Sequence, residues 1–287
     1  MLKKIIRTLI LNRVHIIASA PAIMWCWSEF LKMPFRGIDY FIITLTVACI
    51  CEGNRITDIV EDKVNCPDDL VDAQIKSKAI RFFCFAGGST ALILALITEP
   101  TWELAGLVAF GAAVGYFYNS SPLPSRHDLR LKSMFIVKNL SSGAGWSAGL
   151  LVFPMLRSHA QPEMTFFIAF AYMFCTVATY EIMWDIRDID GDSRAGIRTL
   201  PIVLGTAHAR MYAVVLQCIC LGLILTGLMK GILTPLWSLF LLPGFGLITL
   251  IILFPNFIRY NRNLSHILVV ALCAFACLGA LLASRFG

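Results

Sequence analysis

The chain has 287 residues, of which 58% are hydrophobic and only 15% charged, and its mean hydropathy is +0.75. Soluble globular domains carry about 25% charged residues, and disordered chains have far fewer apolar ones, so both classes are excluded. The formal net charge of +6 matters less than where the charges lie. The composition predicts a polytopic membrane protein.

Apolar stretches long enough to cross a bilayer recur along the whole chain. They predict about nine transmembrane helices, at residues 14–31, 38–53, 80–98, 103–118, 138–156, 164–183, 209–229, 233–255 and 264–284. Arg13 and His15 interrupt the apolar stretch ahead of a short motif that is similar to a signal-peptidase site, so we expect the first helix to be retained. The expected fold is all-α: a membrane helical bundle around a central cavity, with one domain over residues 1–287.

Lysine and arginine residues gather in alternate loops. Most of the 24 lie before residue 14 or within 55–81, 126–138, 187–210 and 259–262. The remaining five lie in the other loops, which would face the opposite side of the membrane: Lys32, Arg36, Arg157, Lys230 and Arg285. The positive-inside rule then places the N-terminus and the long loops in the cytoplasm, and a bacterial cell membrane is the expected location. Anionic membrane lipid accounts for the basic residues, so no nucleic-acid partner is expected.

The ten cysteines suggest neither disulfides nor zinc. Most stand alone in apolar runs, where cysteine packs as a small hydrophobe, and no Cys-x-x-Cys is present. The five histidines are scattered and form no pair with metal-ligand spacing.

Acidic residues concentrate in two segments, each next to a predicted span on the cytoplasmic side. In the first, Asn54, Asp58 and Asp62 stand four residues apart. On a helix, each such step advances about 6 Å along the axis and turns little around it, so the three side chains are expected on one face.

The second segment repeats this arrangement. Asp185, Asp188 and Asp192 stand at i, i+3 and i+7, with Glu181 one turn before them. So many aligned carboxylates repel one another, and acidic groups near membrane depth usually face a functional interior. Carboxylate and amide oxygens suit Mg²⁺, which prefers phosphate as a further ligand. Two such faces opposite each other would hold a metal-bridged diphosphate.

These segments resemble the paired aspartate motifs of the UbiA-type intramembrane prenyltransferases, typified by 4-hydroxybenzoate polyprenyltransferase. Asn54, Asp58 and Asp62 match the Asn-x-x-x-Asp-x-x-x-Asp pattern, and Asp188 with Asp192 match the second motif. The stretch from Arg194 to Gly205 resembles the continuation of that motif, and Tyr118 through Lys132 resembles a diphosphate-contacting stretch. The chain departs from the family at Arg55, where an aspartate is common, and in the unusually acidic segment 68–72.

The resemblance implies Mg²⁺-dependent transfer of an isoprenyl group from an isoprenyl diphosphate to a lipophilic acceptor, expected to be aromatic or quinone-like. The implied metal ligands are Asn54, Asp58, Asp62, Asp188 and Asp192, with Asp185 as a further candidate. Fixed cations would stabilise the departing diphosphate. The residues implied for this diphosphate site are Lys132, Arg130, Arg198, Arg194, Lys138 and Tyr118.

Two other functions remain open from the sequence. A terpene cyclase of the same superfamily would trap the allylic cation within its own substrate. A divalent-cation transporter would use the acidic faces to bind Mg²⁺, although none of the predicted spans carries a carboxylate at its middle. Metal-dependent release of diphosphate separates the enzymes from the transporter, and release without an acceptor favours the cyclase.

Overall fold

The computed structural model describes residues 9–34, 36–120, 129–238, 241–242, 252–253 and 262–286, except for the side chains of 68 and 262–264. These parts of the chain contain helices and no strand. The predicted span 233–255 and the segment 121–128 after Tyr118 lie largely or wholly outside the described residues.

Helices cover the other eight predicted spans. They are α2 (Val14–Leu31), α3 (Gly37–Thr57), α6 (Ser77–Thr98), α7 (Trp102–Asn119), α8 (Val137–Ser147), α9 (Phe153–Arg157), α10 (Met164–Arg187), α12 (Leu200–Met229) and α15 (Arg262–Phe286). A π-helical turn, Ala148–Val152, joins α8 to α9, so the Gly- and Ser-rich span is a helix in three parts. Six described helices are long and apolar enough to cross a bilayer: α2, α3, α6, α10, α12 and the Ser265–Phe286 part of α15.

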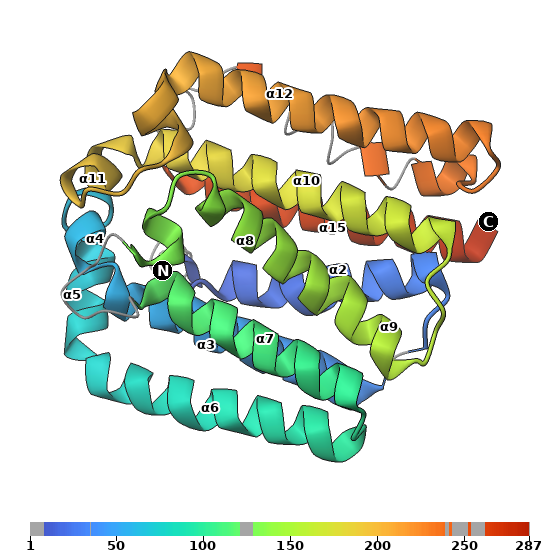
Figure 1. Ribbon diagram of the computed structural model, residues 1–287, viewed down its shortest axis with the longest axis horizontal. Coiled ribbons are helices and arrows are strands. Elements are labelled where there is room, and N and C mark those ends of the chain that lie inside the picture. The colour runs from blue at the N-terminus through green and yellow to red at the C-terminus, as the bar shows by residue number, and fades with distance from the viewer. Residues whose placement is uncertain are drawn as a thin grey trace, which may run out of the picture.

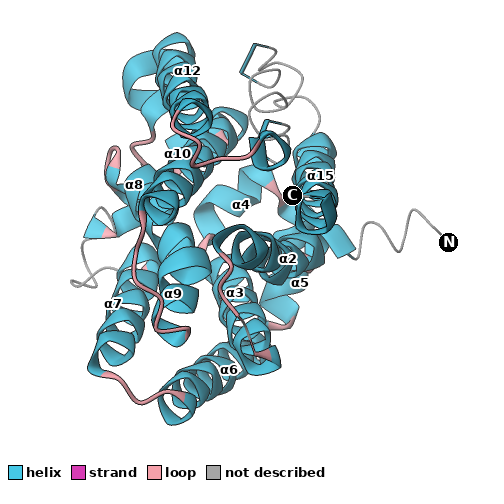
Figure 2. Ribbon diagram, turned by 90° about the vertical axis from the view of Figure 1, so that its right-hand side faces the viewer, coloured by secondary structure: helices cyan, strands magenta, loops and turns pink. Residues whose placement is uncertain are grey.

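The bundle has an apolar core in which a few charged side chains are also buried, and it exposes large apolar side chains on its outer helices. Asp39, Arg55 and Asp185 are at most 1% exposed, whereas Phe82 on α6 and Trp102 on α7 are 74% and 81% exposed. Figure 2 shows α6 and α12 at opposite edges of the bundle, with α2, α3 and α10 between them. Exposed apolar side chains on the outer helices, with ionisable groups facing the bundle interior, are the arrangement expected of a membrane protein.

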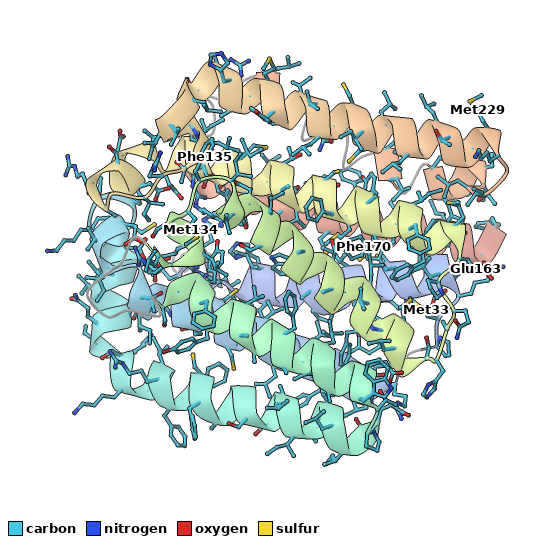
Figure 3. The ribbon with its side chains drawn as sticks, in the orientation of Figure 1. Met33, Met134, Phe135, Glu163, Phe170 and Met229 are labelled. Carbon is cyan, nitrogen blue, oxygen red and sulfur yellow. The ribbon has the colours of Figure 1, made fainter. Side chains whose placement is uncertain are left out.

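Short helices gather at one end of the bundle. They are α4 (Ile59–Asn65), α5 (Pro67–Ile75), α11 (Ile189–Arg194) and the 3₁₀ turn Leu131–Ser133. Figure 1 shows α4, α5 and α11 together at the left, where α3 and α10 end. In Figure 3, Met134 and Phe135 lie toward this end, and Met33, Glu163 and Met229 mark the other.

The opposite end is held by a buried ion pair. The carboxylate of Asp39, near the start of α3, accepts a hydrogen bond from Nε of Arg157 at 2.7 Å. It also accepts a hydrogen bond from the backbone N–H of Arg36. Arg157 ends α9 and is 5% exposed. The pair therefore ties the beginning of α3 to the end of α9, far from the acidic segments.

The long helices break at the first aspartate of each motif. Asp58 separates α3 from α4 with φ −91° and ψ 34°, and Asp188 separates α10 from α11 with φ −101° and ψ 10°. Aspartate competes with helical backbone bonding through its own side chain, which favours such junctions. Each motif therefore spans a junction between two helices. The i→i−4 backbone bonds nevertheless continue through both junctions, so each motif keeps its helical register.

Candidate functional site

Helices α4 and α11 bring the two acidic motifs together. The side chain of Asn65, the last residue of α4, accepts from the backbone N–H of Gly191 at 3.2 Å. Its Nδ2 donates to the carbonyl oxygen of Asp188 at 3.4 Å. A Cβ on Gly191 would lie 2.3 Å from Nδ2 of Asn65, so a side chain at position 191 would displace the Asn65 amide from these bonds.

Replacing Gly191 by alanine is expected to destabilise the protein by about 1–3 kcal/mol, the usual cost of overpacking. The added methyl group would displace the Asn65 side chain and break its hydrogen bonds to Gly191 and Asp188. Thermal unfolding of the purified protein in detergent measures the change. Gly88→Ala is the control, because nothing lies within 4 Å of a Cβ there. A Gly191→Ala protein that melts like the control would contradict the packing described here.

The first motif is engaged by polar neighbours and by basic residues after α7. Oδ1 of Asn54 accepts from Nδ2 of Asn119 at 2.7 Å. The ammonium of Lys132 contacts Asp58 and lies 3.1 Å from Oε1 of Glu61. Nη2 of Arg130 lies 3.7 Å from the same Glu61 oxygen. Glu61 thus shares Lys132 with Asp58 and also lies near Arg130.

The second motif is engaged in the same way. Arg187 donates two bonds to Asp188, at 3.0 and 2.8 Å, and a third to Oγ of Ser265 on α15. Nζ of Lys138 lies 2.5 Å from Oδ1 of Asp185 and 3.8 Å from Oδ2 of Asp192. The first aspartate of each motif, Asp58 or Asp188, is therefore paired with a cation.

The second aspartate of each motif lacks a hydrogen-bonded partner for one oxygen. Oδ2 of Asp62 and Oδ2 of Asp192 are buried and accept no hydrogen bond from any described residue. Burial and the nearby Asp58 carboxylate raise the pKa of Asp62 to about 7. Burial also raises the pKa of Asp192 to about 7, opposed by Lys138 and reinforced by Asp185.

Unpaired buried carboxylate oxygens are costly unless a cation arrives to bind them. In the described part of the chain, no three His, Cys, Asp or Glu side chains form a ready-made metal cage. Mg²⁺ seldom uses such a cage: it keeps several waters and combines one or two carboxylates with substrate phosphates. Asp62 on α4 and Asp192 on α11 fit that pattern.

The residues implied for diphosphate binding fall into two groups. Lys132, Arg130 and Lys138 are engaged with the carboxylates of the two motifs. Arg194, at the end of α11, and Arg198 are exposed, and the backbone N–H of Arg198 donates to the carbonyl of Ser133. Tyr118 is half-buried near the end of α7 and lies within electrostatic range of Lys138, Asp185 and Asp58. All of them lie at the end of the bundle that holds α4 and α11.

Sequence reasoning overlooked the polar residues that hold the motifs in place. Asn119 and Asn65 are single polar side chains at the ends of helices. Such residues are common there without any role in a site, so the sequence did not single them out. For Glu61, the sequence indicated a place at the edge of the first motif and a carboxylate that partly replaces the one missing at position 55, but it did not indicate the contacts with Lys132 and Arg130. Their positions on the helix ends were visible, but their partners come from elements far away in the chain.

The acidic segment after α4 is explained by Arg55. This arginine is 1% exposed, and its guanidinium contacts Glu52 at 2.7 Å, Asp69 at 2.8 Å and Asp72 at 2.7 Å. Lys76 also pairs with Asp72, at 2.8 Å. We call Glu52, Arg55, Asp69 and Asp72 the Arg55 cluster. It fastens α5 to the end of α3, beside Asn54.

Acid is expected to loosen this cluster. Hydrogen bonds from Lys76 and Arg55 hold the pKa of Asp72 below its ordinary value of 3.8. The stabilisation is therefore present above pH 3.8 and is lost as the pH falls through the lowered pKa in the folded protein. Unfolding in detergent between pH 7 and pH 3 should show a smaller pH dependence in Asp72→Asn than in the wild type. The exposed Glu163, changed to Gln, serves as the control, and an unchanged pH dependence in Asp72→Asn would contradict the pairing.

Comparisons with known proteins identify relatives of this chain. The chain is 25% identical to digeranylgeranylglyceryl phosphate synthase of Methanoculleus marisnigri over 227 residues, or 75% of this chain and 73% of that protein. It is 22% identical to 2-acyl-4-prenylphloroglucinol 6-prenyltransferase of Humulus lupulus over 193 residues, or 62% and 46% of the two chains.

Solved structures share the fold. A UbiA homologue from Aeropyrum pernix superposes with a TM-score of 0.70 at 16% identity, covering 93% of this chain and 98% of that one. A UbiA homologue from Archaeoglobus fulgidus bound to DMAPP and Mg²⁺ gives a TM-score of 0.67 at 14% identity, covering 97% and 99%. Residues 17–263 match the UbiA prenyltransferase family, and this protein is a member of that family.

Proposed function

We propose that this prenyltransferase moves an isoprenyl group from an isoprenyl diphosphate to a lipophilic acceptor and requires Mg²⁺. The observation that carries the proposal is that Asp62 and Asp192, each with a buried and unsatisfied carboxylate oxygen, lie on α4 and α11, two helices that contact each other through Asn65 and Gly191. The Archaeoglobus fulgidus homologue, solved with DMAPP and Mg²⁺, supports the same donor and metal here.

The proposed chemistry divides among the chain's own residues. Asp62 and Asp192 would hold Mg²⁺, with Asn54, Asp58, Asp188 and Asp185 as further proposed ligands. Bound Mg²⁺ would neutralise the diphosphate as its bond to the isoprenyl carbon breaks. Lys132 and Lys138, with Arg130, stand among the carboxylates, where they would stabilise the charge that develops on the leaving group. The exposed side chains of Arg194 and Arg198 would bind the diphosphate as it enters the site.

The acceptor is proposed to be either aromatic or a lipid alcohol. The motifs favoured an aromatic or quinone-like acceptor, and the similarity to the Humulus lupulus enzyme supports that choice. The similarity to digeranylgeranylglyceryl phosphate synthases favours a glyceryl phosphate lipid as the second candidate. A phenolic acceptor and a lipid alcohol each carry a hydroxyl group on the head.

The end of the bundle that holds α4, α5 and α11 is proposed to face the cytoplasm. Arg55, Lys76, Lys132, Lys138 and Arg187 all lie at this end, as the positive-inside rule requires. Water-soluble isoprenyl diphosphates would then reach the motifs directly.

Release of diphosphate by the purified protein tests the reaction class. We expect release that depends on Mg²⁺ and on chain length across a series of isoprenyl diphosphates, and that rises on addition of a phenolic or a glyceryl phosphate acceptor. Equal release with and without acceptors would indicate a cyclase. No binding of any isoprenyl diphosphate would overturn the proposal.

A further inference from the structure

Helices α8 and α10 meet along a polar seam that leads away from the second motif. Lys138 and Asn139 on α8 contact Asp185 on α10, at 2.5 and 3.1 Å. One turn further along, Ser142 donates to Oε1 of Glu181 at 2.6 Å. We call these five residues the α8–α10 seam. Gly143 permits the close approach, since a Cβ there would lie 3.1 Å from the carbonyl oxygen of Phe174.

The seam contains one more carboxylate than it has cations. The ammonium group of Lys138 forms an ion pair with Asp185 and also lies near the carboxylate of Asp192. Glu181 is 7% exposed, and the described residues place no cation within ion-pair distance of it. Its described hydrogen-bond partner is the neutral hydroxyl of Ser142. A carboxylate at membrane depth without a countercharge is expensive and marks a functional position.

A second atom of the seam lacks a partner. Asn139 is 3% exposed; its Nδ2 donates to Asp185, but its Oδ1 accepts no hydrogen bond from a described residue. A buried amide oxygen left unsatisfied costs about 1–3 kcal/mol, so such an oxygen usually meets water or a ligand. The seam thus offers two hydrogen-bond acceptors, the Glu181 carboxylate and the Asn139 oxygen, to the hydrogen-bond donors of a bound ligand.

The seam lies close to both motifs. Glu181 precedes Asp188 by seven residues on α10, so it lies about 10 Å deeper along the helix axis. Tyr118 on α7 is within electrostatic range of Glu181, Lys138 and Asp58 together. A head group at the seam would therefore stand beside the place where the motifs would hold a diphosphate, on its membrane side.

We propose that Glu181 is the general base of the transfer and that the α8–α10 seam binds the hydroxyl-bearing head of the acceptor. This inference rests on the proposed function. The bond from the isoprenyl carbon to the diphosphate oxygen breaks, and its electron pair leaves with diphosphate. The acceptor forms the new bond with its own electron pair, and the proton of its hydroxyl passes to the Glu181 carboxylate. Ser142 holds that carboxylate in place, and Asn139 accepts a hydrogen bond from the head group.

Glu181→Gln tests the assignment, because Gln keeps the shape and can still accept from Ser142 but cannot take a proton. The assay uses wild type and variant in detergent with Mg²⁺ and the isoprenyl diphosphate that the wild type prefers. The acceptors are a 1-O-alkylglycerol phosphate and an alkylphenol, each graded in acidity by fluorine substitution. We expect kcat to fall on the order of 10²–10⁴-fold, the usual contribution of a general base. The KM for the isoprenyl diphosphate should not change.

The acidity series separates a base from a structural residue. The loss caused by Glu181→Gln should shrink as the acceptor becomes more acidic, since an acidic hydroxyl needs less help to lose its proton. Glu181→Asp should recover part of kcat, and the exposed Glu163→Gln should behave as wild type. Wild-type kcat in Glu181→Gln, or an equal loss across the series, would overturn the assignment. A wild type that transfers to neither acceptor class would instead overturn the proposed function.

Discussion

Asp62→Asn and Asp192→Asn are each expected to lose transferase activity on the order of 10³-fold while melting no lower than the wild type. Three powers of ten correspond to about 4 kcal/mol, the scale of charge stabilisation that a bound metal supplies. Stability should hold because each substitution replaces a buried carboxylate that has an unsatisfied oxygen by a neutral amide of the same shape. Diphosphate release over a range of Mg²⁺ concentrations, together with thermal unfolding in detergent, measures both effects.

These positions separate activity from folding better than the first aspartates do. Asp58→Ala and Asp188→Ala should also abolish transfer, but each removes a carboxylate that pairs with a largely buried cation, so stability should fall as well. Among the described residues, Asp58→Ala leaves Lys132 with Glu61 alone, and Asp188→Ala removes the carboxylate that Arg187 binds. Asp190→Asn is the matched control for Asp192→Asn, because Asp190 is exposed on the same helix, α11, and is not part of the motif. Full activity in both Asp62→Asn and Asp192→Asn would contradict the proposed metal site.

Arg55→Met is expected to destabilise the protein by about 3–5 kcal/mol, the usual cost of removing one member of a buried ion pair. Methionine fills much of the space but leaves Glu52, Asp69 and Asp72 facing one another without their shared cation. Unfolding in detergent at pH 7 measures the loss. Because the cluster lies beside Asn54, activity should fall together with stability.

Two further variants check the cause. Arg81→Met makes the same change at an exposed arginine on α6 and should leave stability nearly unchanged. Adding Asp69→Asn to Arg55→Met should recover part of the loss, since it removes one of the repelling carboxylates. If Arg55→Met melts like Arg81→Met, the Arg55 cluster does not hold α5 in place.

The Arg55 cluster also accounts for the departures of this chain from the family pattern. An arginine at position 55 and acidic residues in segment 68–72 look unrelated in the sequence. In the structure they are two halves of one contact, since the guanidinium of Arg55 binds Asp69 and Asp72. The acidic segment thus has a structural role at the edge of the site.

Much of the architecture could be predicted because membrane helices obey a local rule. A run of about 20 apolar residues must satisfy its backbone bonds internally, so its position can be read along the chain. Seven of the spans named from the sequence, such as 14–31 and 164–183, coincide with single described helices, and 138–156 with three consecutive helical pieces. The breaks at Asp58 and Asp188 escaped prediction because they depend on one residue's backbone angles.

Eight of the predicted spans, the two carboxylate motifs and the family that they resemble could be identified along the chain, since each depends on spacing within one segment. Which carboxylates are paired and which are left unsatisfied emerges from the packed helices. Lys132 and Asp58 are 74 positions apart, and Asn65 and Gly191 are 126 apart. Such pairings follow from how helices pack, and packing depends on many weak contacts at once, which no single segment encodes.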